Sequence, residues 1–481
     1  MKSHKVFAYF VLFLLVSPFL ILLYKFPLSP QLDFQEFFWA LKNTIFQATL
    51  SALCSLLMGT WAALGLISVK PKIKKILEII CLAPNFLPPL FTLLAVFYWV
   101  DPFPTGVIGI AFVHAVINFG LVGVSLSRSI ETKLGGMAEL AAIEGSSRLH
   151  FLRKVFIPTL KSDYIELFIF VFSICFASFS IPLMVGGGRG TTLEVLIYEK
   201  MRLSMDWGGA VLISILQLAV LAFFAKSLLR FKSSKSAGTY EIRWLGFKSG
   251  AGMMGLFAVL YLIGYFDSVI SGFNSSTTFL WQDGFLRGSL GTLWIGLATG
   301  FLILALLISI TLSMGFPWLR NWLRFYLAPS TTLTGFAFLV LGPNEGFFSY
   351  LKIPLALALL FVGALYRLGW EGEVDRLAGQ IATAEIMGAS SWACFWSVLW
   401  PQVRKRAFLL SGLAAAWACG DYALSRILAY NDMTLALMTE TLMSTYRLGL
   451  ASLLSLGVLL IAILCFFIFW SLNYVDRRKS S

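Results

Sequence analysis

Apolar residues occupy most of this chain in long runs, and short polar or basic segments separate one run from the next. Many of the runs are long enough for a helix to cross a bilayer, which takes about 20 residues. A β-barrel would instead show segments of about ten residues with alternating hydrophobicity, and we find none in the sequence. We therefore predict an all-α integral membrane protein with twelve transmembrane helices. The expected ranges are 6–24, 44–68, 76–100, 105–126, 164–185, 208–228, 251–271, 288–313, 325–342, 351–370, 408–429 and 448–470.

The charged residues agree with a membrane protein and argue against nucleic acid as a partner. Only 13% of residues are charged and the mean hydropathy is +0.83, which leaves too little polar surface for a soluble globule. The net charge of +13 comes from short basic clusters between apolar runs, such as Lys70–Lys75 and Arg404–Arg406. By the positive-inside rule, we assign about 28 of the 37 Lys and Arg residues to the cytoplasmic side.

The N-terminal segment has two interpretations. Lys2 and Lys5 precede an apolar run that ends at Tyr24, and this arrangement resembles a signal peptide. The run is longer than a usual signal h-region, and no A-x-A cleavage site follows it. We expect a retained first helix with the N-terminus in the cytoplasm, and twelve crossings then place both termini on the cytoplasmic side.

Repeated anchor residues predict an internal duplication. Gly145 and Pro158 recur as Gly388 and Pro401, both 243 residues later. The polar, basic segment 229–250 is the best linker, so we expect a first domain at 1–228 and a second at 251–481. Six crossings in each half give both halves the same orientation, related by a pseudo-twofold axis along the membrane normal.

The anchors lie in two segments that each predict a helix, a glycine turn and a second helix. In the first, Gly145 ends a helix and Ser146 or Ser147 caps the next. Apolar side chains then follow at the spacing of a single helix face. That predicted face comprises Leu149, Leu152, Val155 and Phe156, with Pro158 at the start of the next span.

The second segment repeats the pattern at the same offsets. Gly388 supplies the turn and Ser390 or Ser391 the cap. The predicted face comprises Trp392, Phe395, Val398 and Leu399, and Pro401 follows. Both segments fall on the cytoplasmic side, where a short amphipathic helix either rests on lipid headgroups or docks into a partner. Two equal segments at a fixed spacing favour docking into a two-lobed partner.

The first segment resembles the "EAA" loop of binding-protein-dependent ABC import permeases: E-A-A, three residues, G, twelve residues, P. Glu139, Ala141, Gly145 and Pro158 match it, with Leu140 in place of the first Ala. The second segment keeps Gly388, Ala389, Ser390 and Pro401, but Ala382 holds the Glu position. The resemblance implies that each loop is a coupling helix seated in a cleft of a separate cytoplasmic ATPase dimer.

Other motifs extend the resemblance toward the thiamine and ferric-iron branch of that family. "HAVINFG" contains His114 and Asn118 at the positions of the fourth-span H-x-x-x-N motif. The stretch from Gly420 looks most like the thiamine permeases. The loop that begins at Gly186 resembles the Gly-rich loop and external helix, which implies contacts to a periplasmic or lipid-anchored binding protein. The candidates for those contacts are Gly186, Gly187, Gly188, Glu194 and Tyr198.

Several polar residues have both functional and structural interpretations. "GGGRGTT" lacks the Lys-Ser/Thr of a phosphate loop, so we expect no ATP site in the chain. His114 and Asn118 lie one helical turn apart, and packing between helices is favoured over substrate contact. Asp421 at membrane depth either lines the pathway or pairs with Arg426. With three His residues and no Cys pair at ligand spacing, we expect neither a metal site nor a cofactor.

Taken together, these features and the family resemblance predict the fused permease subunit of an ABC importer in a bacterial inner membrane, with no catalytic residues of its own. Thiamine is the first substrate candidate and ferric iron the second. An ion-coupled secondary transporter is the alternative class, but it would be expected to carry more intramembrane carboxylates than Asp421. A membrane-embedded enzyme is a third option, for which no nucleophile–base or metal arrangement is visible.

Overall fold

The computed structural model describes nine stretches of the chain, and every regular element in them is a helix. This confirms the all-α fold class. Of the expected linker 229–250, residues 229–244 lie outside the described stretches. The described stretches are 2–26, 33–87, 89–228, 245–274, 283–313, 317–325, 330–343, 347–429 and 433–475.

Eight of the described helices are long and apolar enough to cross a membrane, and a bent pair, α3 (Pro71–Phe86) with α4 (Pro89–Trp99), is a ninth candidate. The chain is therefore a multi-pass helical membrane protein. The eight are α1 (Lys2–Lys25), α2 (Phe34–Leu66), α5 (Val107–Ile143), α10 (Trp207–Leu228), α11 (Lys248–Asn274), α12 (Asp283–Leu312), α15 (Phe347–Leu365) and α21 (Leu448–Val475).

Helical structure extends well past two of the apolar runs that predicted it. The run at 105–126 belongs to α5, which continues to Ile143. Buried residues such as Leu134 and Ala138 continue one face of α5 into the polar segment, so the helix does not end where the hydropathy falls. After the run at 351–370 the chain also stays largely helical, from α15 through the π-helical turn η3 (Tyr366–Trp370), where Gly369 interrupts the helix, into α16 (Glu371–Ile386).

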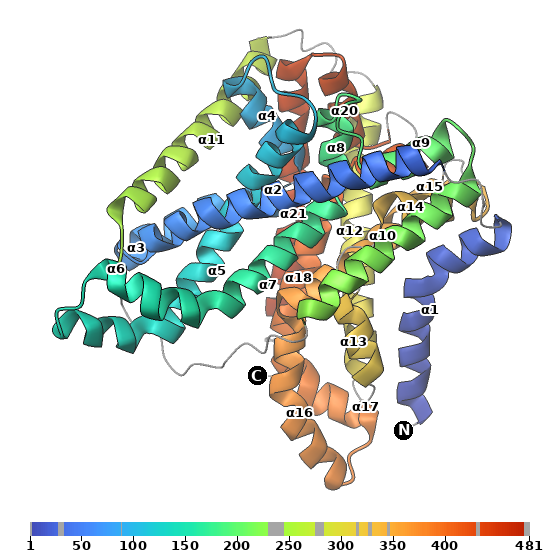
Figure 1. Cartoon of the computed structure of the whole chain (residues 1–481). Coiled ribbons are helices and arrows are strands. Elements are labelled where there is room, and N and C mark those ends of the chain that lie inside the picture. Colours follow the sequence, from blue (N-terminus) through green and yellow to red (C-terminus); the bar gives the residue numbers. More distant parts are fainter. Residues whose placement is uncertain are drawn as a thin grey trace. The chain divides into compact units, whose positions relative to one another are not determined.

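The chain divides into two compact units. One comprises Phe34–Val195 and Ala219–Ser271. In it α2, α5 and α7 (Ile157–Phe176) lie side by side, and α3 packs along α5 (Figure 1). A Cβ on Gly120 would meet the Cys81 carbonyl, so α3 and α5 approach closely there because the residue is glycine.

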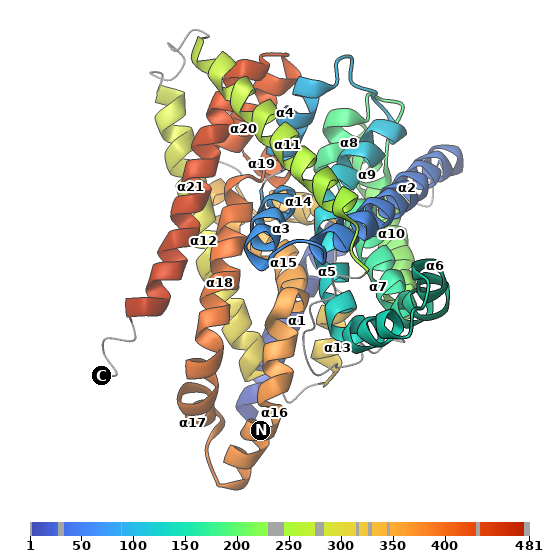
Figure 2. The ribbon, with the colours of Figure 1, turned by 90° about the vertical axis from the view of Figure 1, so that its left-hand side faces the viewer.

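The other unit comprises Met1–Asp33, Leu196–Leu218 and Gly272–Ser481. Its centre is formed by α12, α18 (Trp400–Cys419) and α21, which lie side by side (Figure 2). Two short helices, α14 (Thr331–Val340) and α19 (Ala423–Leu428), pack against each other in the same unit.

The helix order repeats along the chain. The helix α6 (Arg148–Phe151), the π-helical turn η1 (Leu152–Phe156), α7 and α8 (Ser180–Val185) each have a counterpart that begins 243 residues later. Next, α9 (Leu193–Arg202) and α20 (Leu435–Ser444) begin 242 residues apart. The counterparts of the first four are α17 (Ser391–Cys394), η4 (Phe395–Leu399), α18 and α19.

Candidate functional site

The first glycine turn closes the end of α5. Gly145 has a φ of 71°, in the left-handed region that glycine adopts without a steric penalty. The Ser146 N–H donates to the Ala141 carbonyl at 2.9 Å, and the Ser147 hydroxyl accepts from the His150 N–H at 3.3 Å. Of the two serines considered for the cap of the following helix, Ser147 is therefore the one that caps it.

The second turn has the same geometry at equivalent positions. Gly388 has a φ of 84°, and the Ala389 N–H donates to the Ala384 carbonyl at 3.0 Å. The Ser390 hydroxyl accepts from the Ala393 N–H at 3.2 Å. Both segments are thus helix–turn–helix hairpins with matching caps, which we call the first and second loop (residues 139–158 and 382–401).

The helix that follows each turn differs from the prediction of one continuous apolar face. Each begins as a single α-turn and changes to the π-helical turns η1 and η4, whose wider spacing shifts side chains off the 3.6-residue stripe. Phe156 and Phe395 are buried, whereas Leu149 and Trp392 are mostly exposed. Leu152 is half-buried. Pro158 and Pro401 lie in the first turns of α7 and α18, where the missing N–H costs little.

Both loops present large apolar side chains to their surroundings. Ile143 is 83% exposed and Met387 is 82% exposed, values uncommon for such residues outside an interface or a lipid contact. Glu139 is also exposed, and Ala141 is half-buried. The other exposed large apolar residues are Leu140, Leu149 and Ile157 in the first loop and Ile386, Trp392 and Trp396 in the second.

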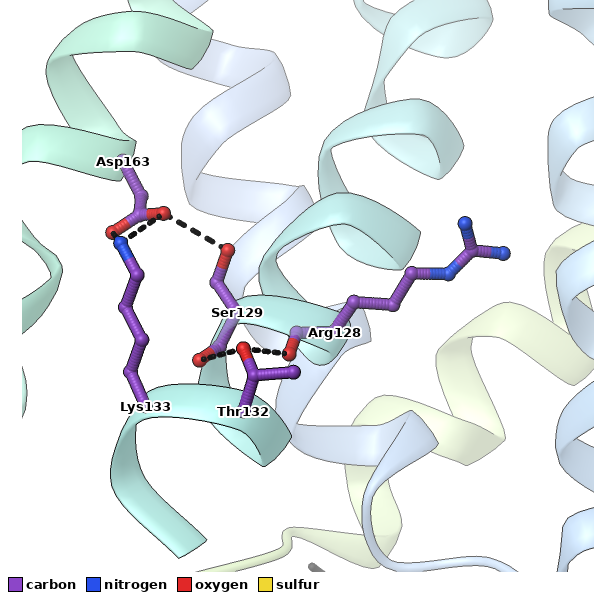
Figure 3. Close-up of polar contacts among 5 residues, drawn as sticks. All are labelled: Arg128, Ser129, Thr132, Lys133 and Asp163. Carbon is purple, nitrogen blue, oxygen red and sulfur yellow. Dashed lines mark hydrogen bonds and ion pairs between the residues drawn. The ribbon is translucent and has the colours of Figure 1, made fainter. Parts of the chain in front are cut away.

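An ion pair braces the first loop (Figure 3). The Lys133 ammonium on α5 lies 2.7 Å from Asp163 Oδ2 on α7, and the Ser129 hydroxyl donates to Asp163 Oδ1 at 2.9 Å. Both charged side chains are 11% exposed. The brace joins the two helices that enter and leave the loop.

The second loop is held differently. Gly369 in η3 has a φ of 143° and a ψ of 0°, so the helix is interrupted between α15 and α16. The Arg406 guanidinium on α18 donates to the Leu368 carbonyl at 2.8 Å. Arg406 stands 243 residues after Asp163. Asp163 and Arg406 are therefore equivalent positions that each connect to the preceding helical segment. Asp163 does so through an ion pair, and Arg406 through a hydrogen bond to a backbone carbonyl.

His114 and Asn118 belong to a buried polar cluster that connects α2, α5 and α7. His114 Nδ1 lies 3.0 Å from Gln47 Oε1, and the Gln47 amide donates to the Cys175 carbonyl at 2.7 Å. The Asn118 amide donates to the His114 carbonyl at 2.9 Å. These contacts match packing between helices. Within the described stretches no group of three His, Cys, Asp or Glu side chains could hold a metal ion.

Asp421 and Arg426 do not form the ion pair considered from the sequence. The Asp421 carboxylate accepts from the N–H groups of Leu424 and Ser425, at 3.0 and 3.2 Å, and so caps α19. Arg426 instead forms its ion pair with Glu440 on α20. The sequence did not predict this pair, because 14 residues and a loop separate its members.

The Arg426–Glu440 pair also lies near α9. The Arg426 guanidinium also lies close enough to the Tyr198 side chain to interact with it, and the ring of Tyr198 lies 6.2 Å from that of Phe336 on α14. Burial raises the pKa of Glu440, and the Arg426 charge opposes that rise.

The Gly-rich loop after α8 forms a tight turn. Gly187 and Gly188 have φ values of 54° and 70° and are exposed, whereas Gly186 is buried. The Glu194 side chain is fully buried, so it is not accessible to a binding protein in this conformation. Tyr198 is half-buried and contacts Arg426.

One polar contact fixes the start of α9 and recurs in the second copy. The Thr44 hydroxyl on α2 accepts from the Leu193 N–H at 2.8 Å. The Thr292 hydroxyl on α12 accepts from the Leu435 N–H at 2.9 Å. Leu193 and Leu435 are the first residues of α9 and α20, so an equivalent hydrogen bond attaches each of these helices to a long membrane helix.

These features describe a polytopic helical membrane protein with a duplicated set of loops and short helices. The sequence profile of the family described as "Binding-protein-dependent transport system inner membrane component" matches residues 55–235 and again residues 305–481. The chain belongs to this family and carries two copies of its permease domain. It is a transport component and not itself an enzyme.

The similar proteins found in the comparison are all named thiamine transport system permease protein ThiP. The Escherichia coli protein is 33% identical over 116 residues, which is 24% of this chain and only 22% of that protein. The Haemophilus influenzae protein is 23% identical over 68% of this chain and 65% of its own length. The Brucella suis protein is 24% identical over 75% of this chain and 70% of its own length. No solved structure matches the chain.

Proposed function

We propose that this chain is the membrane permease of a thiamine importer, driven by a separate ATPase dimer and supplied by a binding protein. The observation that carries the proposal is the double match to the permease family, together with similarity over most of the chain to proteins named as thiamine permeases. Ferric iron, the other substrate considered, has no comparable support.

The proposed architecture has twelve crossings in two parallel halves, at 1–228 and 251–481, joined by a linker at 229–250 and related by a pseudo-twofold axis along the membrane normal. The eight long helices and the bent pair supply nine crossings. The additional three are α7, α18 and the short apolar α14. With an even number of crossings, both termini lie in the cytoplasm, in agreement with the basic segments assigned to that side.

The two loops are the proposed contacts to the ATPase dimer. Their matched turns, caps and exposed apolar side chains suit two equal clefts of a dimeric partner. ATP-driven closure of that dimer would draw the loops together and change which side of the permease is open. A full change of population between two such states requires a free-energy difference of about 5.5 kcal/mol. The proposed coupling residues are Glu139, Ala141, Gly145, Leu149, Leu152, Pro158, Gly388, Ser390, Trp392, Phe395 and Pro401.

On the opposite face, a periplasmic or lipid-anchored binding protein is the proposed source of substrate. The exposed turn at Gly187 and Gly188 remains a contact candidate. His114 and Asn118 are proposed to hold helices together, because their polar atoms bond to α2, α5 and α7. Asp421 is proposed to position α19 through its cap rather than to contact substrate.

Uptake in cells tests this function. A bacterial strain that can neither make nor import thiamine is supplied with this chain, the ATPase and the binding protein, and accumulation of radiolabelled thiamine is measured. We expect ATP-dependent uptake that excess unlabelled thiamine abolishes and that ferric citrate leaves unchanged. Uptake that persists without the ATPase would instead indicate a secondary transporter, and ferric-iron uptake without thiamine uptake would reverse the substrate assignment.

A further inference from the structure

Arg426 connects two positions that the duplication makes equivalent. Glu440 is the sixth residue of α20, and Tyr198 is the sixth residue of α9. The Arg426 guanidinium pairs with Glu440 and lies near the Tyr198 side chain. A side chain that reaches two residues related by a pseudo-twofold axis lies close to that axis. In a transporter of two parallel halves, the interface at this axis is where a translocation path runs.

Both charged residues of this ion pair belong to the second permease domain, and their equivalents in the first domain are uncharged. The residue equivalent to Arg426 is Leu183, 243 positions earlier, and the residue equivalent to Glu440 is Tyr198 itself. The duplication therefore does not explain the ion pair. The Glu440 side chain is 4% exposed and that of Arg426 is 39% exposed, so the carboxylate is enclosed while its cationic partner is in part accessible.

An enclosed carboxylate needs a cation beside it, since an unpaired charge at that depth is costly. When Arg426 moves away, another cation can take its place on Glu440. The Tyr198 ring lies near Arg426, the ion-pair partner of Glu440, and near the ring of Phe336. An aromatic face attracts organic cations. A carboxylate and an aromatic ring that lie near one shared cation suit a flat, positively charged heterocycle in its place.

We propose that Arg426, Glu440 and Tyr198 form a cation-selective gate in which a passing organic cation, such as the thiazolium of thiamine, replaces the Arg426 guanidinium on Glu440. This inference rests on the proposed function. The closed gate is the ion pair seen here, and the open gate exchanges one cation for another without leaving Glu440 unpaired.

Three variants distinguish a gate that recognises a cation from an ion pair that only keeps the path closed. They are Glu440→Gln, Arg426→Gln and the double variant. In the double variant two amides can still hydrogen-bond, so the contact persists without charge. The assay is thiamine uptake by the complete complex, with co-purification of the ATPase as the control for assembly. We expect uptake to fall about tenfold or more in both variants that lack the carboxylate, because a hydrogen bond to a charged group is lost. Uptake by Arg426→Gln should fall less than in those two variants, because Glu440 can still receive the passing cation.

Uptake by the assembled double variant at the wild-type level would overturn the gate, and so would equal losses in all three variants, which would indicate closure alone. If the unmodified complex takes up no thiamine, the substrate assignment in the proposed function has failed. A measurement that needs no thiamine then tests the gate itself.

That measurement compares cationic and anionic methanethiosulfonate reagents at Tyr198→Cys in the assembled complex. The chain without this change supplies the background from its native cysteines, five of which are buried. We expect the cationic reagent to react faster, and Glu440→Gln to reduce that preference about tenfold. The absence of a charge preference, or of any reaction at position 198 with or without ATP, would overturn the gate.

Discussion

The Lys133 ammonium lies 2.7 Å from Asp163 Oδ2 and ties together the helices on either side of the first loop. Both side chains are 11% exposed, so removal of one partner leaves the other charge largely enclosed. We expect Asp163→Leu to lower the free energy of unfolding by about 2 kcal/mol. Thermal unfolding of the purified protein in detergent measures this loss.

The double variant Lys133→Met with Asp163→Leu should recover much of that loss, because apolar residues of similar size replace a buried pair well. A matched control is Glu373→Gln, which breaks the more exposed pair with Arg376. Such surface pairs contribute about 0–1 kcal/mol. A double variant less stable than Asp163→Leu alone would contradict the role of this ion pair as a brace.

The glycine turns are strained for any other residue, although space is available. A Cβ on Gly145 or Gly388 would meet nothing within 4 Å, yet both have positive φ. We expect Gly145→Ala and Gly388→Ala each to cost about 1–2 kcal/mol and to weaken co-purification with the ATPase.

The matched controls are Gly136→Ala and Gly379→Ala, since these glycines lie inside α5 and α16 and also have open space around them. Alanine there should stabilise the helix by about 1 kcal/mol. ATPase binding that falls equally in the turn variants and the controls would show that general destabilisation, and not turn geometry, is responsible.

The sequence predicted the parts of this molecule that depend on local chemistry. Long apolar runs predicted the membrane helices, and a glycine followed by serine predicted each capped turn. The sequence predicted the helix end at Gly145 but not that this helix continues the span at 105–126, because hydropathy falls at the membrane boundary while a buried stripe through Leu134 and Ala138 extends the helix.

Contacts between residues that are far apart in the chain could not be predicted from the sequence either. The Lys133–Asp163 brace and the Arg426–Glu440 pair join different helices, and charge patterns within one helix cannot reveal them. Asp421 illustrates the same limit: its proximity to Arg426 in sequence suggested a pair, but its carboxylate caps α19.

The interruption of the helix at Gly369 gives a further prediction. A Cβ there would collide with the Arg406 guanidinium, and the φ of 143° is unfavourable for any L-residue. We expect Gly369→Ala to destabilise the protein by about 2–3 kcal/mol and to impair coupling between ATP hydrolysis and uptake. Gly372→Ala, three residues on in α16 with open space around it, is the control and should be neutral or stabilising.

Arg406→Met tests the other side of this contact. It removes the donor to the Leu368 carbonyl but keeps an unbranched stem, so about 1–3 kcal/mol should be lost. If Gly369→Ala were as stable as Gly372→Ala, the interruption of the helix at η3 would not be a feature of the native protein.

The last prediction concerns the threonines that hold α9 and α20. Thr44 and Thr292 are buried, and each hydroxyl accepts from the first N–H of a short helix while donating to a carbonyl in its own helix. Valine has nearly the same shape but cannot accept, so Thr44→Val leaves the Leu193 N–H unpaired. The expected cost is about 1–3 kcal/mol, measured by thermal unfolding, and Thr292→Val should cost a similar amount.

Serine at either position keeps the hydroxyl and loses only a methyl group, so it is the matched control, with an expected loss of about 1 kcal/mol. Because the two hydrogen bonds are equivalent and lie in different units, the two valine substitutions should be additive within about 0.5 kcal/mol. Valine variants more stable than their serine counterparts would show that packing of the methyl groups, and not the hydrogen bond, fixes the start of α9 and α20.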